Sequence, residues 1–146
     1  MLMNEIDPIL MQFEYSISDL TKKYDGKQSD RLFANTVWMT DFLDSKVRSQ
    51  LNTLRDAVES LDAKDLTIQN NVSIIVGQIK EIESALNALL FPYKNRYDLP
   101  QIYQARRGNL PTINEKLRSL RHRVDIITNT MSQKKKIEQE DWYDNL

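Results

Sequence analysis

Aliphatic side chains recur at alternating spacings of three and four residues through the middle of the chain, between Val47 and Leu89. This spacing keeps one apolar stripe on the same side of an α-helix for many turns, and it is typical of helices that pack against other helices. Asp65 is the one acidic residue in the pattern, where it fits either a register-setting polar position or a local kink. The stripe, called the central seam below, consists of Val47, Leu51, Leu54, Val58, Leu61, Ile68, Val72, Ile75, Ile79, Ile82, Leu86 and Leu89.

A second apolar stripe with the same spacing lies nearer the C-terminus. It begins after Pro111 and is followed by three consecutive lysines at 134–136. The pattern again indicates a helix with one apolar side. This C-terminal seam consists of Ile113, Leu117, Leu120, Val124 and Ile127.

Proline, glycine and capping residues divide these patterns into segments. Asp7 is suited to begin a helix and Gly26 to end one. Pro92 is expected to stop the long helix, and Gly108 with Pro111 predicts a kink. The sequence therefore predicts an all-α, elongated coiled-coil or helical-bundle subunit with one long central helix and shorter flanking helices. The expected segments are a short N-terminal amphipathic helix and turn over 1–28, a long coiled-coil helix over 29–90 capped by Ser29 or Asp30, a loop over 91–97, a basic C-terminal helix over 98–136 kinked near 108–111, and an acidic tail over 137–146.

The expected helices differ too much in length to cover one another. The central helix would have roughly 60 residues, against about 16 and about 25 to 40 in its neighbours, so part of its seam would stay uncovered. Because an exposed apolar stripe of this size marks a binding surface, we expect both seams to form a partner interface with helices of other chains. A self-contained antiparallel bundle is the less favoured alternative. On the favoured reading, Ile75→Asp would detach the chain from its partners.

Positive charge is concentrated in one part of the chain. The net charge is −1, yet residues 94–136 contain eleven Lys and Arg against three acids, and residues 137–146 contain four acids and no base. Basic residues that flank a coiled-coil stripe help to select the partner helix, so acidic flanks on another coiled-coil subunit are the favoured complement. Peripheral contact with an acidic membrane and a solvated face are alternatives, and nucleic acid is not the expected partner. The expected basic surface consists of Arg106, Arg107, Lys116, Arg121 and Arg123.

Nothing in the sequence predicts catalytic residues, a metal site or a cofactor. The chain has no cysteine, and its one histidine, His122, stands between two arginines that oppose protonation and metal binding. The sequence contains neither a glycine-rich phosphate loop nor a nucleophile elbow, and we expect a protein that is not an enzyme. The lack of cysteines, of a secretory signal and of any apolar run long enough to span a membrane leads us to expect a cytoplasmic protein.

Four stretches of the chain resemble, in order, the snapin family of small helical subunits. Snapin subunits belong to the assemblies that build lysosome-related organelles and position lysosomes. The resemblance implies a non-enzymatic scaffold that joins other coiled-coil subunits, contacts SNARE proteins and works in the cytoplasm or peripherally on endosome and lysosome membranes. The stretches are SDRLFA at 29–34, LRDAVESLD at 54–62, YDLPQIYQARR at 97–107 and INEKLRSL at 113–120.

Two other functions fit the same patterns. The first is a helical subunit of a kinetochore or microtubule-associated complex, with the basic helix directed at acidic tubulin or nucleic acid. The second is a self-contained helical bundle that binds acidic lipids through its basic surface.

Overall fold

The structure, a computed structural model, describes residues 5–24, 40–61, 66–95 and 98–144, and their side chains except at 23, 24, 67, 99 and 131–144. These residues are helical nearly throughout and include no strand, so the expected all-α fold is confirmed. The elements are α1 (Ile6–Tyr24), a π-helical stretch η2 (Asp41–Val47) that continues into α4 (Arg48–Glu59), α5 (Leu66–Lys94) and α6 (Leu99–Asp144).

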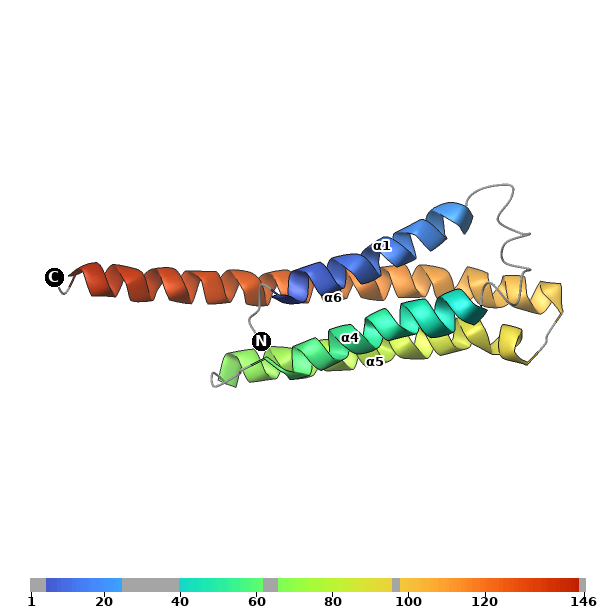
Figure 1. Cartoon of the computed structure of the whole chain (residues 1–146), viewed down its shortest axis with the longest axis horizontal. Coiled ribbons are helices and arrows are strands. Elements are labelled where there is room, and N and C mark those ends of the chain that lie inside the picture. The colour runs from blue at the N-terminus through green and yellow to red at the C-terminus, as the bar shows by residue number, and fades with distance from the viewer. Residues whose placement is uncertain (1–4, 25–39, 62–65, 96–97, 145–146) are drawn as a thin grey trace.

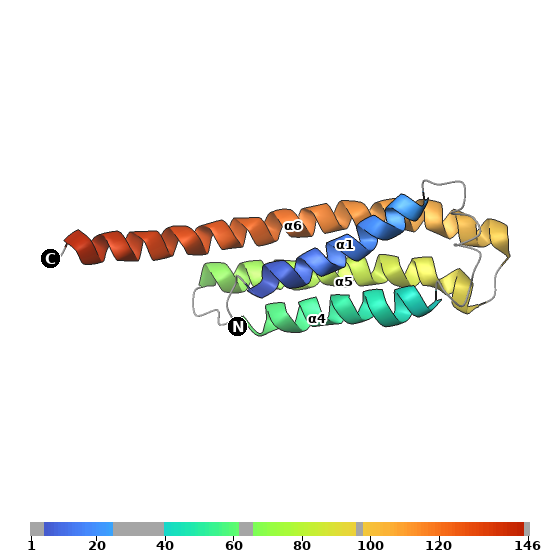
Figure 2. The same cartoon turned by 45° about the horizontal axis from the view of Figure 1, so that its top comes forward.

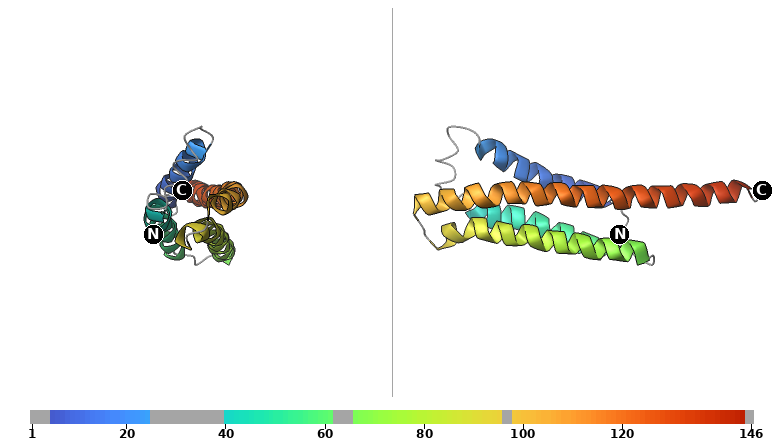
Figure 3. Two further views of the ribbon diagram at one scale, coloured as in Figure 1. Left: turned by 90° about the vertical axis from the view of Figure 1, so that its right-hand side faces the viewer. Right: turned by 180° about the vertical axis from the view of Figure 1, so that it is seen from behind.

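Successive helices run in opposite directions and lie side by side (Figures 1 and 2). Arg55 of α4 pairs with Glu83 of α5, and Lys116 of α6 pairs with Glu81 of α5 at 3.0 Å, which fixes how neighbouring helices are aligned. Seen along the long axis, the helices surround a common centre (Figure 3, left). The described residues thus form an up-down-up-down bundle.

The first helix is the one predicted from the sequence. The helix α1 spans 19 residues, close to the expected 6–23. Asp7 lies inside its first turn, where its carboxylate binds Arg121 of α6. The predicted helix end at Gly26 and the predicted caps Ser29 and Asp30 lie outside the described residues. One side of α1 is fully buried in the bundle, through Ile6, Leu10, Phe13, Ile17 and Leu20.

The expected continuous helix over 29–90 is wrong, because the chain reverses direction within it. The helix α4 ends at Glu59, and the next two backbone N–H groups, of Ser60 and Leu61, bond back to Asp56 and Val58 at 3.0 and 3.2 Å. The next helix, α5, begins at Leu66 and runs antiparallel to α4 (Figure 1). The two halves of the central seam therefore face each other within one chain instead of forming one long stripe.

Two prolines that were expected to interrupt helices lie inside them. Pro92 is part of the last turn of α5, so the predicted loop over 91–97 begins later than expected. Asn95 closes this end, since its backbone N–H and its side-chain amide both donate to the carbonyl of Phe91, at 3.0 and 2.9 Å. Tyr93, just after the proline, is buried, so packing holds the chain helical here.

The helix α6 continues through the predicted kink at 108–111 as far as Asp144, across the segment expected to be an acidic tail. The hydroxyl of Thr112 donates to the carbonyl of Gly108 at 2.9 Å, and the side-chain amide of Asn109 donates to Ala105 at 2.8 Å. Both bonds lie within the helix around Pro111, which lacks an N–H to donate to the carbonyl of Arg107. Leu110 and Ile113 are buried on either side of the proline, so tertiary packing overrides the local helix-breaking tendency.

Candidate functional site

The structure places the predicted interface residues in the core of the chain itself. All of the C-terminal seam and nine residues of the central seam are buried by other helices of the same polypeptide. Leu61, Ile68 and Val72 are the partly exposed members. The central seam is therefore not left uncovered by a difference in helix length, because the chain reverses after α4 and packs the two halves of the seam against each other. The buried members are Val47, Leu51, Leu54, Val58, Ile75, Ile79, Ile82, Leu86, Leu89, Ile113, Leu117, Leu120, Val124 and Ile127.

Two of the partly exposed residues of the central seam, Leu61 and Val72, line an open groove between the end of α4 and the first half of α5. Its volume is about 510 Å³. Leu61, Val72 and Val76 form its apolar floor, where each packs against the core while remaining partly exposed. Glu59 and Lys80 stand at its edge with opposite charges. We call this site the hairpin groove; it is lined by Glu59, Leu61, Gln69, Val72, Ser73, Val76, Gly77 and Lys80.

The groove is open because α4 is too short to cover the start of α5. The helix α4 ends at Glu59, which lines the groove together with Val72 and Val76 of α5. The first turns of α5, from Leu66, extend past the end of α4 (Figure 1). Gly77 adds to the opening, since a Cβ atom built there would meet no other atom within 4 Å.

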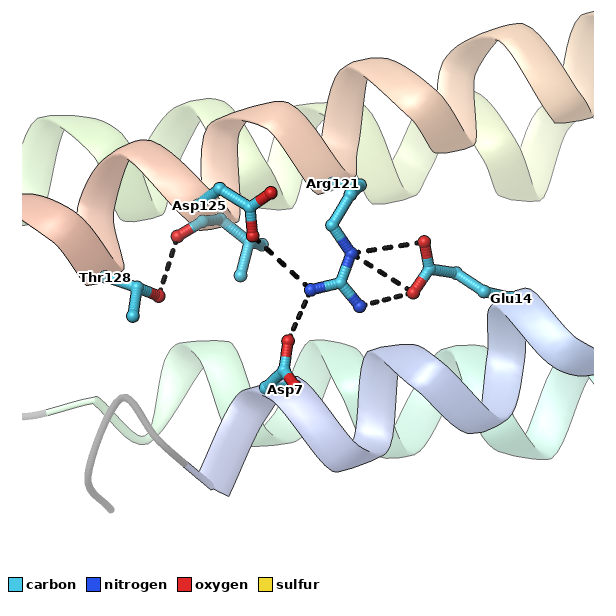
Figure 4. A network of polar contacts seen from close by, with 6 residues as sticks. Asp7, Glu14, Arg121, Asp125 and Thr128 are labelled. Carbon is cyan, nitrogen blue, oxygen red and sulfur yellow. Dashed lines mark hydrogen bonds and ion pairs between the residues drawn. The ribbon is translucent and has the colours of Figure 1, made fainter.

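The basic residues of α6 find acidic partners in their own chain. Arg121 lies between two carboxylates of α1 and one of its own helix (Figure 4). Its Nε atom is 3.1 Å from both carboxylate oxygens of Glu14, its Nη1 atom binds Asp7, and the same Nη1 lies 3.5 Å from Asp125. These bonds, chiefly those to Glu14, raise the pKa of Arg121 above its usual value. The cluster fixes α1 against α6 at a point where their apolar sides already meet.

The other residues of the predicted basic surface differ in their burial and in the groups that they contact. Lys116 binds Glu81, and Arg123 donates to the side-chain carbonyl of Asn71 at 3.3 Å, so both join α6 to α5. Arg106 is only 6% exposed, and its guanidinium lies 5.0 Å from the ring centre of Tyr103. Arg107 is exposed. Of the predicted basic surface, Arg121 and Lys116 thus have acidic partners on α1 and α5 of the same chain.

The charged residues that join α4 to α5 were not predicted from the sequence. Arg48 donates from Nε to Asp44 at 2.8 Å and lies 3.7 Å from Glu83, which also pairs with Arg55. Lys94 binds the second oxygen of Asp44 at 3.1 Å. The spacing of seven residues between the two arginines was the available signal, because residues seven apart lie on one side of a helix.

The carboxylate of Asp44, which accepts from both Arg48 and Lys94, has a shifted pKa. Its pKa is lowered, first because Arg48 donates a hydrogen bond to it and then because Lys94 does so. A lowered pKa in the folded state means that the pairing stabilises the fold above the ordinary value of 3.8 and ceases to do so as the pH falls through the lowered value. Water screens the contribution, since the side chain is 34% exposed.

Asp44→Asn is therefore expected to cost about 0.5 kcal/mol of unfolding free energy at pH 6 to 7 and nothing at pH 2. The measurement is urea unfolding of both proteins at several pH values. The difference between the two proteins should begin to shrink below the ordinary carboxyl pKa of 3.8 and disappear as the pH falls through the lowered pKa of Asp44. A difference that stays constant down to pH 2 would show that the neutral side chain changes packing and that the ion pairs contribute nothing.

A second cleft, of about 340 Å³, lies between α1 and α6. Within it, the side-chain amide of Asn114 donates to the hydroxyl of Thr21 at 3.1 Å, and Glu14 binds Arg121. Among the described residues, no three His, Asp or Glu side chains are grouped so as to hold a metal ion. The polar groups of this cleft thus serve mainly to bind α1 to α6.

Two further findings concern the chain as a whole. Within the part that the structure describes, no helix combines the length and the apolar character needed to cross a membrane. Comparisons of the chain with protein-family models, with curated proteins and with solved structures find no match in any of the three.

Proposed function

We propose that this protein is a non-enzymatic helical scaffold subunit that holds a helix of a partner protein in the hairpin groove. The observation that carries the proposal is the apolar floor of Leu61, Val72 and Val76, which the bundle leaves partly uncovered. Elsewhere on α5, Leu66 and Ile74 are 69% and 44% exposed. Partly uncovered apolar side chains with charged residues at their edge are characteristic of sites that bind other proteins.

The shape of the groove favours an amphipathic helix as its occupant. It lies along α5 and is open at the end of α4, so a helix placed there would continue the packing that α4 begins. Such a helix would bring apolar residues at spacings of three and four, with charges opposite to Glu59 and Lys80 at its sides. The partner is thus another coiled-coil or helical subunit, as the periodicity of the sequence also indicates.

The wider role that we propose follows the resemblance to snapin. It is that of a cytoplasmic subunit of a multi-subunit complex in lysosome and endosome biogenesis or positioning, linked to vesicle fusion through SNARE proteins. The support is the order of the four matching stretches, of which 54–62 leads into the hairpin groove and 113–120 lies on α6.

Gly77→Glu tests the groove without disturbing the core. Gly77 is helical, exposed and has open space around its Cα, so a glutamate fits the fold while placing a charged side chain in the groove. We expect the variant to fold normally and to lose the stoichiometric companions that co-purify with the wild-type protein, with affinity reduced at least about tenfold, or roughly 1.4 kcal/mol. The measurement is affinity purification of tagged protein followed by identification and binding assays of the companions.

Gly108→Glu is the matched control. Gly108 is also helical, exposed and free of neighbours within 4 Å, but it lies on α6 and does not line the groove. This variant should keep every companion. If Gly77→Glu bound the companions as tightly as the wild-type protein does, the hairpin groove would not be the binding site.

The second candidate is a free-standing bundle that acts alone on acidic lipids. The observation that favours it is the burial of both seams by the chain itself. Arg107 and Arg118 would then supply the exposed positive charge. Binding of the monomer to vesicles containing acidic lipid, weakened by added salt and by Arg107→Glu, would support this function in place of the scaffold.

A further inference from the structure

The opening of about 340 Å³ between α1 and α6, here called the α1–α6 cleft, brings together basic side chains from two helices. Figure 1 shows α1 crossing α6 at an angle. Lys22 comes from the last turn of α1 and Arg118 from α6, and both line the cleft. Ser18, one turn before Lys22 on the same side of α1, lines it as well. All three side chains are exposed, so a ligand can reach them from solvent, and the volume suits a small ligand.

Other polar groups of the cleft are already engaged within the protein. The carboxylate of Glu14 accepts from Arg121 through both of its oxygens, at 3.1 Å from Nε. The side-chain amide of Asn114 donates to the hydroxyl of Thr21 at 3.1 Å, and this hydroxyl donates in turn to the carbonyl of Ile17 at 2.7 Å. These groups hold α1 against α6, and the charge of Glu14 is used by Arg121.

The remaining polar groups of the cleft are donors that have no partner. Within the described part of the chain, no hydrogen bond or ion pair engages Lys22, Arg118 or the hydroxyl of Ser18. Two of these groups are cations, and the one acid that lines the cleft, Glu14, is bound by Arg121. Positive charges that converge without a counter-charge repel each other and attract anions from solution.

We propose that the α1–α6 cleft binds a phosphate group, held by Lys22 of α1 and Arg118 of α6 with the hydroxyl of Ser18 as a further donor. A phosphate monoester carries about two negative charges and three acceptor oxygens, which match two cations and a hydroxyl. Arginine can direct two parallel N–H groups at such an anion, and lysine adds a compact charge. Phosphate groups of this kind occur on small soluble molecules and on lipid headgroups.

A phosphate bound in this cleft would join α1 to α6. Its contacts come from both helices, so undocking of α1 removes half of the site. Binding must therefore stabilise the docked position of α1, because a ligand favours the state to which it binds. The cleft shares no lining residue with the hairpin groove, so this inference does not depend on the proposed binding of a partner helix.

The first test is calorimetric titration of the full-length protein with inorganic pyrophosphate at physiological ionic strength. We expect a dissociation constant of about 1 mM or below. Acetate, which carries a single charge, is the control and should bind at least about tenfold more weakly. Absence of pyrophosphate binding at about 10 mM would overturn the proposal.

Substitutions test whether the cleft is the site. Lys22→Gln and Arg118→Gln are each expected to weaken pyrophosphate binding about tenfold. Ser18→Glu places a carboxylate among the two cations and should abolish binding. Since all three side chains are exposed, the variants should fold as the wild-type protein does, which circular dichroism checks.

Arg107→Gln is the matched control for Arg118→Gln. Arg107 is also an exposed arginine of α6, but it does not line the cleft. Its replacement should change the dissociation constant less than about twofold. Equal weakening by Arg107→Gln and Arg118→Gln would overturn the proposal, because binding would then reflect the general positive charge of α6.

Hydrogen exchange of the α1 amides tests whether the anion joins the two helices. At a pyrophosphate concentration of about ten times the dissociation constant, amides that exchange through undocking of α1 should gain about tenfold protection. The gain should be absent in Ser18→Glu. Pyrophosphate binding with no gain in α1 protection would show that the anion contacts one helix alone, and would overturn the proposed bridge.

Vesicles distinguish a lipid headgroup from a soluble phosphate. If the protein binds phosphatidylcholine vesicles that contain phosphatidylinositol monophosphate, and pyrophosphate and Lys22→Gln both reduce this binding, the phosphate belongs to a headgroup. Binding of pyrophosphate without binding of these vesicles assigns the cleft to a soluble molecule. Equal binding to vesicles of phosphatidylserine, which has no phosphate monoester, with no effect of Lys22→Gln would overturn the proposal in favour of diffuse attraction to acidic surfaces.

Discussion

Ile75→Asp is expected to unfold the bundle. Ile75 lies in α5 with no exposed surface, among the residues that α4 and α6 cover. A carboxylate at this position loses its hydration within an apolar core, which costs several kcal/mol out of a total stability of about 5 to 15 kcal/mol. The expected result is loss of the cooperative urea transition together with loss of much of the helical circular dichroism signal.

Ile74→Asp is the matched control, since it introduces the same charge one residue earlier. Ile74 is 44% exposed, so its replacement should change the unfolding free energy by no more than about 0.5 kcal/mol. The two variants also distinguish a central seam that is buried within the chain from one that is buried against a partner. If Ile75→Asp were as stable as Ile74→Asp but failed to bind partners, the seam would belong to an interface between chains, as the sequence alone suggested.

Phe13→Ala is expected to release α1 from the bundle and to cost about 3 to 5 kcal/mol. Phe13 has no exposed surface and lies at the centre of the buried side of α1. A 19-residue helix of ordinary composition is barely stable in water, so α1 depends on this packing to remain helical. Urea unfolding gives the magnitude, and hydrogen exchange of the α1 amides shows whether this helix opens before the others.

Met11→Ala provides the comparison on the same helix. Met11 is 56% exposed and lies on the outer side of α1, so its truncation should cost well under about 1 kcal/mol. Unchanged protection of the α1 amides in Phe13→Ala would mean that the ion cluster of Arg121 with Asp7 and Glu14, and not apolar packing, holds α1 in place.

Helical periodicity identified which residues are buried but not which helix buries them. The spacing of Leu61 and Ile68 stays in phase across the reversal between α4 and α5, so the pattern gave no sign of a turn there. The Ser60–Leu61 turn contains neither proline nor glycine, the usual markers of a chain reversal. Asp65, which interrupts the stripe, was the sole hint, and a single polar residue is equally compatible with an unbroken coiled coil.

At two prolines, the sequence predicted a break in a helix where the helix continues. Pro92 and Pro111 were expected to end or kink helices, yet both are accommodated within them. The energy that decides the outcome comes from burial of residues such as Tyr93 and Leu110, which sequence position alone does not reveal. The same holds for the partners of Arg121, since Asp7 and Glu14 are more than a hundred positions distant along the chain.

The different sequence distances within the bundle have a consequence for the order of its assembly. Contacts of α5 with its two neighbours close short loops, as in the pairs Arg55–Glu83 and Lys116–Glu81, which are 28 and 35 residues apart. The contact between Arg121 and Glu14 closes a loop of 107 residues. Since α1 also packs against α4, which is much nearer in the sequence, loop-closure entropy favours the contacts between consecutive helices over the contact of α1 with α6. The contact of α1 with α6, which closes the bundle around its core, is therefore expected to form last.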